Sequence, residues 1–483
     1  MSESTRIPSL PLAVFPILLL ITMLGGSVAL FGDSTTSGPG QIALIIAGVA
    51  AGVVGLLNGH SWGDLEKGVS ESIQRAIPAI FILLMVGTLI GLWMFSGTIP
   101  YLIYWGLQIL VPQIFYVATV LLCAVVSISI GSSWTTAGTV GVALIGIAAA
   151  SGLSPTVTAG AIISGAYFGD KLSPLSDTTN LAAAVTETEL FEHIRFLLWT
   201  TIPAMAIALV FFTYYSLTSV AEIDESRITE ISTSIKATYN LTHWLIIPLL
   251  VTLSLAAARQ PAFTSLLLGS LAAAVIGLTT QTQALEADGF IGVIKSIWLI
   301  AANGYTSFTG NEMLDSLLSR GGMDSMLNTV WLIMSAMFFG GMMEKSGALS
   351  VIVRYLLMGV DSGGSLIRRA GLTSLGANLV TSDQYLAIAI PSRMYSQKFI
   401  DMKLHSKNLS RVLEDNGTVT SVLIPWNTCG AFFAATLGIA TSDYLLFCVF
   451  NLASPLISLA YSLANFKIEP LDSVEGLSPG TST

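Results

Sequence analysis

The sequence carries very little charge. Only 10% of its 483 residues are Asp, Glu, Lys or Arg, while 53% are hydrophobic. An average soluble protein is about one-quarter charged. Too few charged side chains remain to cover a water-facing surface, which excludes a soluble globular enzyme and a disordered scaffold. The net charge of −9 offers no cationic surface to nucleic acid, so a nucleic-acid partner is excluded as well.

Cysteine is also scarce. Cys123, Cys429 and Cys448 lie in apolar stretches, without CxxC spacing and without neighbouring histidines. This pattern excludes a disulfide framework and a zinc site, and we expect three small buried hydrophobic side chains. No HExxH or Walker motif is present, which excludes a zinc protease and an ATP-driven pump. We therefore predict no enzyme activity and no cofactor.

Long apolar runs take the place of charge. A spanning helix needs about 20 apolar residues, so the chain predicts an all-α polytopic membrane protein with roughly 10–12 crossings. Strand-length alternation is absent, which favours helices over a β-barrel. The first run, 11–31, resembles a signal-peptide core. Because Arg6 is the only cation before it and the run is long, we predict a retained first helix.

The remaining charges are concentrated in two segments. Residues 220–240 are acidic, whereas residues 368–411 hold seven of the chain's 20 cations. Cytoplasmic loops of membrane proteins carry excess Lys and Arg. We therefore predict a bacterial inner-membrane protein whose loop 393–411 faces the cytoplasm.

The chain also repeats itself weakly. At a shift of 250 residues the Ser-Gly pair 96–97 meets 346–347 and Ser132 meets Ser382, and at 251 Pro174 meets Pro425. Duplicated halves with interrupted helices in matching positions are typical of secondary transporters. The expected division is an N-terminal tail 1–10, a first repeat 11–216, an acidic linker 217–240, a second repeat 241–466 and a polar tail 467–483.

Four polar stretches interrupt the apolar runs, at 131–139, 169–180, 378–384 and 414–428. Polar groups at membrane depth are costly unless they face protein or water, so these stretches indicate a site. Pro174 disfavours helical geometry at Ser173, which predicts a broken helix with free carbonyl oxygens. Oxygen ligands with one negative charge suit a small hard cation such as Na⁺.

These stretches supply the candidate site residues. The ion- or substrate-binding candidates are Asp177, Ser176, Thr178, Thr179, Asn180, Asp170, Ser132, Ser133, Thr135, Ser382, Asp383, Asn427 and Thr428. The expected Na⁺ ligands are Asp177, Ser176, Thr178 and Asn427. The proton-coupling candidates are Asp177, Asp170, Asp383, Glu414 and Asp415. A structural alternative is open for each, since Ser and Thr join membrane helices and an aspartate can cap a helix.

Three of these motifs resemble the NhaC family of bacterial Na⁺/H⁺ antiporters: GDKLSPLSDTTNL at 169–181, GSSWTT at 131–136 and PWNT at 425–428. The resemblance implies the ion transporter superfamily, with two inverted repeats and re-entrant hairpins whose tips meet near mid-membrane. It also implies a possible homodimer. Members of the family include Na⁺/H⁺ antiporters and antiporters that exchange malate for lactate.

The expected mechanism is competition for one carboxylate site. Burial raises the pKa of a carboxyl group, so that it can bind a proton near neutral pH, and Na⁺ favours the ionised form. Alternating access would then export Na⁺ in exchange for protons. The alternative is an organic-anion antiporter coupled to Na⁺ and protons, which binds its substrate at half-helix N-termini. Lys171 is the only cation beside a motif and would assist that binding.

Overall fold

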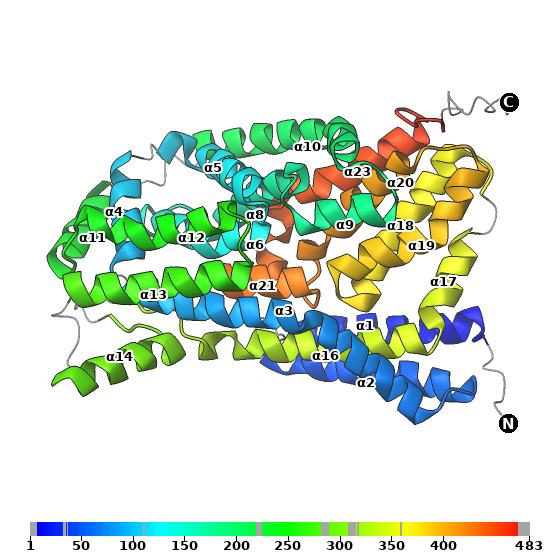
Figure 1. The fold of residues 1–483 in the computed structure, drawn as a ribbon, viewed down its shortest axis with the longest axis horizontal. Helices are drawn as coiled ribbons and strands as arrows, with labels where there is room; N and C mark the ends of the chain where they lie inside the picture. Colours follow the sequence, from blue (N-terminus) through cyan, green and yellow to red (C-terminus); the bar gives the residue numbers. More distant parts are fainter. Residues whose placement is uncertain are drawn as a thin grey trace, which may run out of the picture.

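The computed structural model describes residues 7–471 apart from 32–34, 36, 110–111, 219–224, 282–288, 308–314, 316–317 and 358–359. Residues 1–6 and 472–483, and with them most of both predicted tails, lie outside the described residues. Helices are the regular secondary structure of the described residues (Figure 1), which otherwise contain turns, loops and two isolated β-bridges. The all-α prediction is confirmed.

Seven described helices are long and apolar enough to cross a membrane. Two pairs bent by 101° and 95° raise this number to nine if each pair is one span. The first pair joins α11 (Glu225–Thr238) to α12 (Ile247–Ala257), and the second joins α21 (Thr428–Leu437) to α22 (Thr441–Tyr444). Three further apolar helices are shorter: α5 (Phe115–Ile130), α14 (Gly289–Asn303) and α23 (Val449–Leu463). The described part therefore holds fewer full-length spans than the 10–12 expected from the sequence.

The helices that build and surround the site come from the whole length of the chain. They are α1 Leu10–Phe31, α2 Pro39–Leu57, α3 Trp62–Phe95, α4 Thr98–Ile109, α5 Phe115–Ile130, α6 Ser133–Thr136, α7 Val142–Ala150, α8 Pro155–Leu172, α9 Asp177–Val185, α10 Leu190–Thr218, α11 Glu225–Thr238, α12 Ile247–Ala257, α13 Ala262–Thr280, α14 Gly289–Asn303, α16 Leu327–Lys345, α17 Ala348–Leu357, α18 Gly363–Thr381, α19 Gln384–Asp401, α20 Ser406–Leu413, α21 Thr428–Leu437, α22 Thr441–Tyr444 and α23 Val449–Leu463. Two π-helical turns, Ala137–Gly141 and Glu414–Thr418, continue α6 and α20.

The helices form two packed groups (Figure 1). In one group α16 packs on α2 and α3, α1 on α2, and α13 on α3. In the other group α5 packs on α8, α10 on α23, and α18 on α19. The predicted acidic linker contains α11, which packs against α4, and is therefore partly helical. The three cysteines are free and buried, as expected.

Small residues bring α8 very close to α5. A Cβ on Gly165 would lie 2.2 Å from the carbonyl oxygen of Val120, and one on Gly169 would lie 2.4 Å from that of Ala124. Glycines four residues apart let two membrane helices approach backbone to backbone. Asp170 follows directly, so this packing fixes the position of its carboxyl group.

Matching helix ends support the internal duplication. Helices α5 and α18 end in left-handed residues, Gly131 (φ 69°) and Ser382 (φ 59°), which are 251 positions apart. The next residues, Ser132 and Asp383, are the N-caps of α6 and α19. The N-caps of α9 and α21 are separated by the same 251 positions. Ser132 therefore corresponds to Asp383, not to Ser382 as the sequence shift of 250 had paired it.

Candidate functional site

The predicted helix break lies between α8 and α9. Ser173 is the C-cap of α8, and α9 begins at Asp177 with Ser176 as its N-cap. The carbonyl groups that the break frees are used by side chains. Asn180 Nδ2 donates to the Pro174 oxygen at 2.9 Å and to the Ser176 oxygen at 2.6 Å. The carbonyls of Pro174 and Ser176 thus already have protein donors.

Thr179 continues this pattern. Its hydroxyl donates to the carbonyl oxygens of Asp170 and Lys171, both at 3.3 Å. A buried hydroxyl group needs such a partner. Thr179 therefore fastens the start of α9 to the end of α8, and the structure gives it a positioning contact.

Asp170 is buried against the start of α6. Its Oδ2 accepts hydrogen bonds from Ser133 N at 3.1 Å and from Ser133 Oγ at 2.6 Å. The N-terminal end of a helix favours negative charge. Its Oδ1 is buried and has no hydrogen-bond partner among the described residues. Ser132 caps α6 by accepting from Thr135 N and from Thr135 Oγ1, both at 3.1 Å.

Glu414 opens the π-helical turn after α20 and is fully buried. Its Oε1 accepts from Thr178 Oγ1 at 3.3 Å, and that hydroxyl lies 3.1 Å from Ser176 Oγ. Its Oε2 is another buried oxygen without a partner in the described chain. Glu414 also lies within electrostatic range of Asp170. Hydroxyls from the first half of the chain thus reach a carboxylate from the second half. Such π-turns are frequent at functional sites.

Lys171 and Asp415 form a fully buried ion pair across 244 residues of sequence. Two hydroxyl groups support the pair. Thr200 Oγ1 donates to Asp415 Oδ1 at 2.9 Å, and Ser454 Oγ lies 3.1 Å from the same oxygen. Lys171 Nζ also donates to Ser454 Oγ at 3.0 Å. The sequence identified both charged residues but not their pairing, and it gave no sign of Thr200 or Ser454.

Asp177 has a different environment. It is exposed, and Tyr385 donates its hydroxyl hydrogen to Asp177 Oδ2 at 2.5 Å. Its Oδ1 accepts from the Thr178 backbone N–H at 2.9 Å. Asp177 lines a polar cavity of about 380 Å³. Other polar residues that line this cavity are Ser132, Thr135, Asn180, Arg259 and Gln260.

The second-half candidates lie at the break between α18 and α19. Asp383 caps α19, because its Oδ1 accepts from the Leu386 backbone N–H at 3.0 Å. The carbonyl oxygen of Ser382 accepts from the Thr428 backbone N–H at 2.9 Å. The second of these bonds joins the start of α21 to the end of α18.

Asn427 has a capping contact of the same kind. Its Oδ1 accepts from the Cys429 backbone N–H at 3.0 Å, and its Nδ2 donates to Asn378 Oδ1 at 3.1 Å. Asn378 in turn donates to the Gly417 carbonyl oxygen and, at 3.1 Å, to Thr420 Oγ1. Asn378 was not among the predicted site residues, although it begins the polar stretch 378–384.

Comparison with known proteins gives the family. A family model described as the Na⁺/H⁺ antiporter family matches residues 165–466. The Na⁺/H⁺ antiporter NhaC of Alkalihalophilus pseudofirmus is 38% identical over 87% of this chain and 89% of its own. The chain belongs to the NhaC family of Na⁺/H⁺ antiporters. It is accordingly a multi-pass membrane transporter and not an enzyme, as the sequence predicted.

Relatives with other substrates are about equally similar to this NhaC-family chain. The arginine/ornithine antiporter ArcD of Halobacterium salinarum is 35% identical over 97% of this chain and 94% of its own. The malate-2H⁺/Na⁺-lactate antiporter of Bacillus subtilis is 34% identical over 85% and 86%. Family membership therefore establishes antiport but does not identify the exchanged substrates, which depend on the residues of the site.

The predicted site residues of this NhaC-family protein divide among four places, of which the buried ion pair of Asp415 with Lys171 is one. Asp170 and Glu414 lie with the hydroxyls of Ser133, Ser176 and Thr178, and we call these five residues the carboxylate cluster. Asp177 lies in the polar cavity, and Asp383 and Asn427 cap helices. Within the ranges that the structure describes, no group of three or more His, Cys, Asp or Glu side chains is arranged to hold a metal ion.

Proposed function

We propose that the protein exchanges Na⁺ for protons at Asp170 and Glu414. The observation that carries the proposal is that each carboxylate has one buried oxygen, Oδ1 and Oε2, without a hydrogen-bond partner among the described residues, and that neither forms an ion pair there, whereas Asp415 does. An unpaired buried carboxylate oxygen is costly. Either a proton or a cation removes that cost, and both would occupy the same atoms. Binding of one therefore excludes the other, which is the requirement for exchange.

The surrounding groups support a small alkali cation as the second ligand. Ser133 and Thr178 each contact one of the two carboxylates, and Ser176 contacts Thr178. All of these side chains offer oxygen atoms as ligands, which hard cations prefer. The sequence-based Na⁺ ligand set of Asp177, Ser176, Thr178 and Asn427 stays a prediction. The contacts favour Asp170 and Glu414 as the carboxylates.

The buried ion pair supports the same assignment. Lys171 and Asp415 directly follow the two carboxylates in sequence, so an unpaired ammonium group would repel a cation beside them. Asp415 binds that ammonium group, with Ser454 as a shared partner. Two unit charges interact strongly at short range in a poorly hydrated interior. Neutralising Lys171 therefore keeps the carboxylate cluster favourable for Na⁺.

Proton release from liposomes tests the proposal. Purified protein is reconstituted with a pH-sensitive dye, and NaCl, KCl or choline chloride is added. We expect Asp170→Asn and Glu414→Gln each to abolish Na⁺-dependent proton movement. Asp443→Asn, which changes an exposed acid, should retain it. Normal exchange by a correctly folded Asp170→Asn or Glu414→Gln variant would disprove the assignment.

Exchange of a small organic solute is the second candidate function. The polar cavity of about 380 Å³ holds both Asp177 and Arg259, so it offers a carboxylate and a guanidinium group to a charged solute. ArcD and the malate/lactate antiporter show that similarity of this degree extends to such substrates. Saturable uptake of labelled malate, lactate, arginine or ornithine, reduced by Arg259→Gln, would support this function. Linear, unsaturable flux would count against both candidates.

We further propose the arrangement in the membrane. The repeats 11–216 and 241–466 would have inverted orientation and two chains would form a homodimer. The predicted loop 393–411 would face the cytoplasm of a bacterial inner membrane, although only residues 402–405 of it lie outside α19 and α20. The clustered cations support the orientation. Lys403 is exposed in this loop, so a Lys403→Cys variant should react with a membrane-impermeant maleimide only after the cells are opened. Chemical cross-linking in native membranes tests the dimer.

A further inference from the structure

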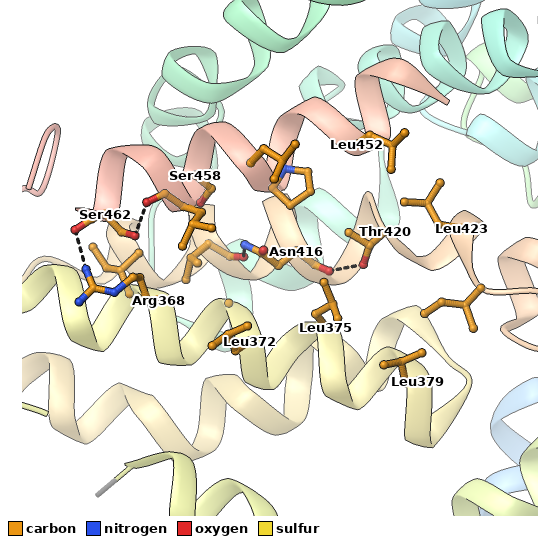
Figure 2. A pocket seen from close by; sticks show the side chains of 17 residues that line it. Arg368, Leu372, Leu375, Leu379, Asn416, Thr420, Leu423, Leu452, Ser458 and Ser462 are labelled. Atoms are coloured by element: carbon orange, nitrogen blue, oxygen red, sulfur yellow. Dashed lines mark hydrogen bonds between the residues drawn. The ribbon is translucent and has the colours of Figure 1, made fainter. Parts of the chain in front are cut away.

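A second cavity lies apart from the carboxylate cluster, between α18, α23 and the segment from α20 to residue 424. It has a volume of about 370 Å³ (Figure 2). Leu372, Leu375 and Leu379 of α18 form one wall, and Leu452 and Leu456 of α23 contribute to another. Apolar cavities of this kind exclude water and bind apolar ligands. The leucine side chains that line the cavity therefore suit a hydrocarbon chain.

The cavity opens sideways from the helix bundle. Leu372 is 57% exposed and Leu456 is 64% exposed, and both line it. In a chain that crosses a membrane, large leucines exposed on the outside of the helix bundle face the lipid. An acyl chain therefore has a direct path into the cavity from the bilayer.

One end of the cavity is cationic. Arg368 lies there, and its Nη1 donates to the carbonyl oxygen of Ser462 at 3.1 Å (Figure 2). Ser462 belongs to the last turn of α23, which ends at Leu463, so this end of the cavity lies where the helix leaves the apolar core. A guanidinium group has five N–H donors and binds phosphate well. The cavity thus combines an apolar wall with an anion-binding end.

A buried hydroxyl group lies between these two parts. Ser458 lines the cavity and is 2% exposed, and its Oγ has no hydrogen-bond partner among the described residues. It precedes Ser462 by four residues, which places it roughly 6 Å deeper along α23. A buried hydroxyl group without a partner is unfavourable, and a ligand atom in the cavity would satisfy it.

We propose that this cavity binds one anionic glycerophospholipid. The phosphate group contacts Arg368, an ester oxygen accepts the Ser458 hydroxyl hydrogen, and one acyl chain lies along the leucine walls. Asn416 also lines the cavity and belongs to the π-helical turn that begins with Glu414 and Asp415. The lipid would therefore contact the same turn that supplies the carboxylate cluster with Glu414.

Photo-crosslinking tests the lipid site in the full-length protein. Nanodiscs contain either a phosphatidylglycerol or a phosphatidylcholine analogue with a diazirine group in the acyl chain, and labelled peptides are identified by mass spectrometry. We expect phosphatidylglycerol to label α18 and α23 about tenfold more than phosphatidylcholine does, because the choline ammonium group offsets the phosphate charge that Arg368 would contact, and tenfold is the factor that a contact with a net charge supplies. This comparison needs no variant.

Variants then locate the contacts. Arg368→Gln should reduce phosphatidylglycerol labelling to the phosphatidylcholine level. Arg354→Gln on α17, an exposed arginine away from the cavity, should leave it unchanged. Leu375→Trp should block labelling by both lipids. Equal labelling of α18 and α23 by the two lipids, unchanged labelling in Arg368→Gln, or labelling only on other helices would overturn the proposal.

Discussion

The two single substitutions in the buried Lys171–Asp415 pair should together lower the free energy of unfolding by more than the double substitution does. Breaking a buried pair leaves an uncompensated charge and costs about 3–5 kcal/mol. Lys171→Met and Asp415→Leu should each have a cost in this range. The double variant leaves no charge. It leaves the Ser454 hydroxyl group without either of its partners, a cost of about 1–3 kcal/mol, whereas the Thr200 hydroxyl group keeps the Leu197 carbonyl oxygen as an acceptor at 3.1 Å.

The four proteins form a double-mutant cycle. The double variant should be more stable than the sum of the single effects predicts, by at least about 2 kcal/mol. The free energy of unfolding is measured in mixed micelles by circular dichroism as denaturant is added. Additive effects of the two substitutions would refute the reasoning, because they would mean that neither charge depends on the other.

A surface pair provides the matched control. Arg75 Nη2 and Glu344 Oε2 are 2.7 Å apart and also join distant parts of the chain, but the two side chains are 36% and 41% exposed. Exposed pairs of this kind contribute about 0–1 kcal/mol. The corresponding cycle with Arg75→Met and Glu344→Leu should therefore give a coupling energy well below that of the buried pair.

Three further substitutions have defined outcomes. Ser133→Ala removes the hydroxyl group that donates to the charged Asp170 carboxylate at 2.6 Å, so a proton should compete better with Na⁺ for that carboxylate. The KM for Na⁺ in the dye assay should therefore rise about tenfold. An unchanged KM would contradict the proposed site. Gly131→Ala should lower the thermal unfolding temperature, because φ is +69° and a Cβ would lie 2.6 Å from neighbouring atoms. Gly376→Ala, whose added Cβ would meet nothing within 4 Å, should leave that temperature unchanged or raise it slightly. Equal effects of the two glycine substitutions would contradict the role assigned to backbone geometry.

Local features of the chain could be predicted from the sequence. The scarcity of charge was enough to predict membrane-spanning helices, because long apolar runs recur along most of the chain. The break after Ser173 follows from Pro174 alone, and the structure confirms it. The helix-cap role left open for Asp177 belongs to the preceding Ser176, whose hydroxyl accepts from the Thr179 backbone N–H.

Long-range pairing could not be predicted. Lys171 meets Asp415 across 244 residues, and Thr178 meets Glu414 across 236, so both contacts depend on how helices from the two halves pack. The free carbonyl oxygens expected at the helix break are another example. Asn180 supplies donors to two of them, and nothing in the sequence shows whether an amide or an ion will take that place.

The Lys171–Asp415 bond has a consequence for motion. It joins the end of α8 to the π-helical turn after α20, in a pocket closed to water. A slide of one segment past the other by a single helical turn, about 5.4 Å, would strand two opposite charges in a dry environment. The two segments should therefore travel as one rigid body through the transport cycle, and the gates that open toward each side of the membrane must be formed by the helices around them.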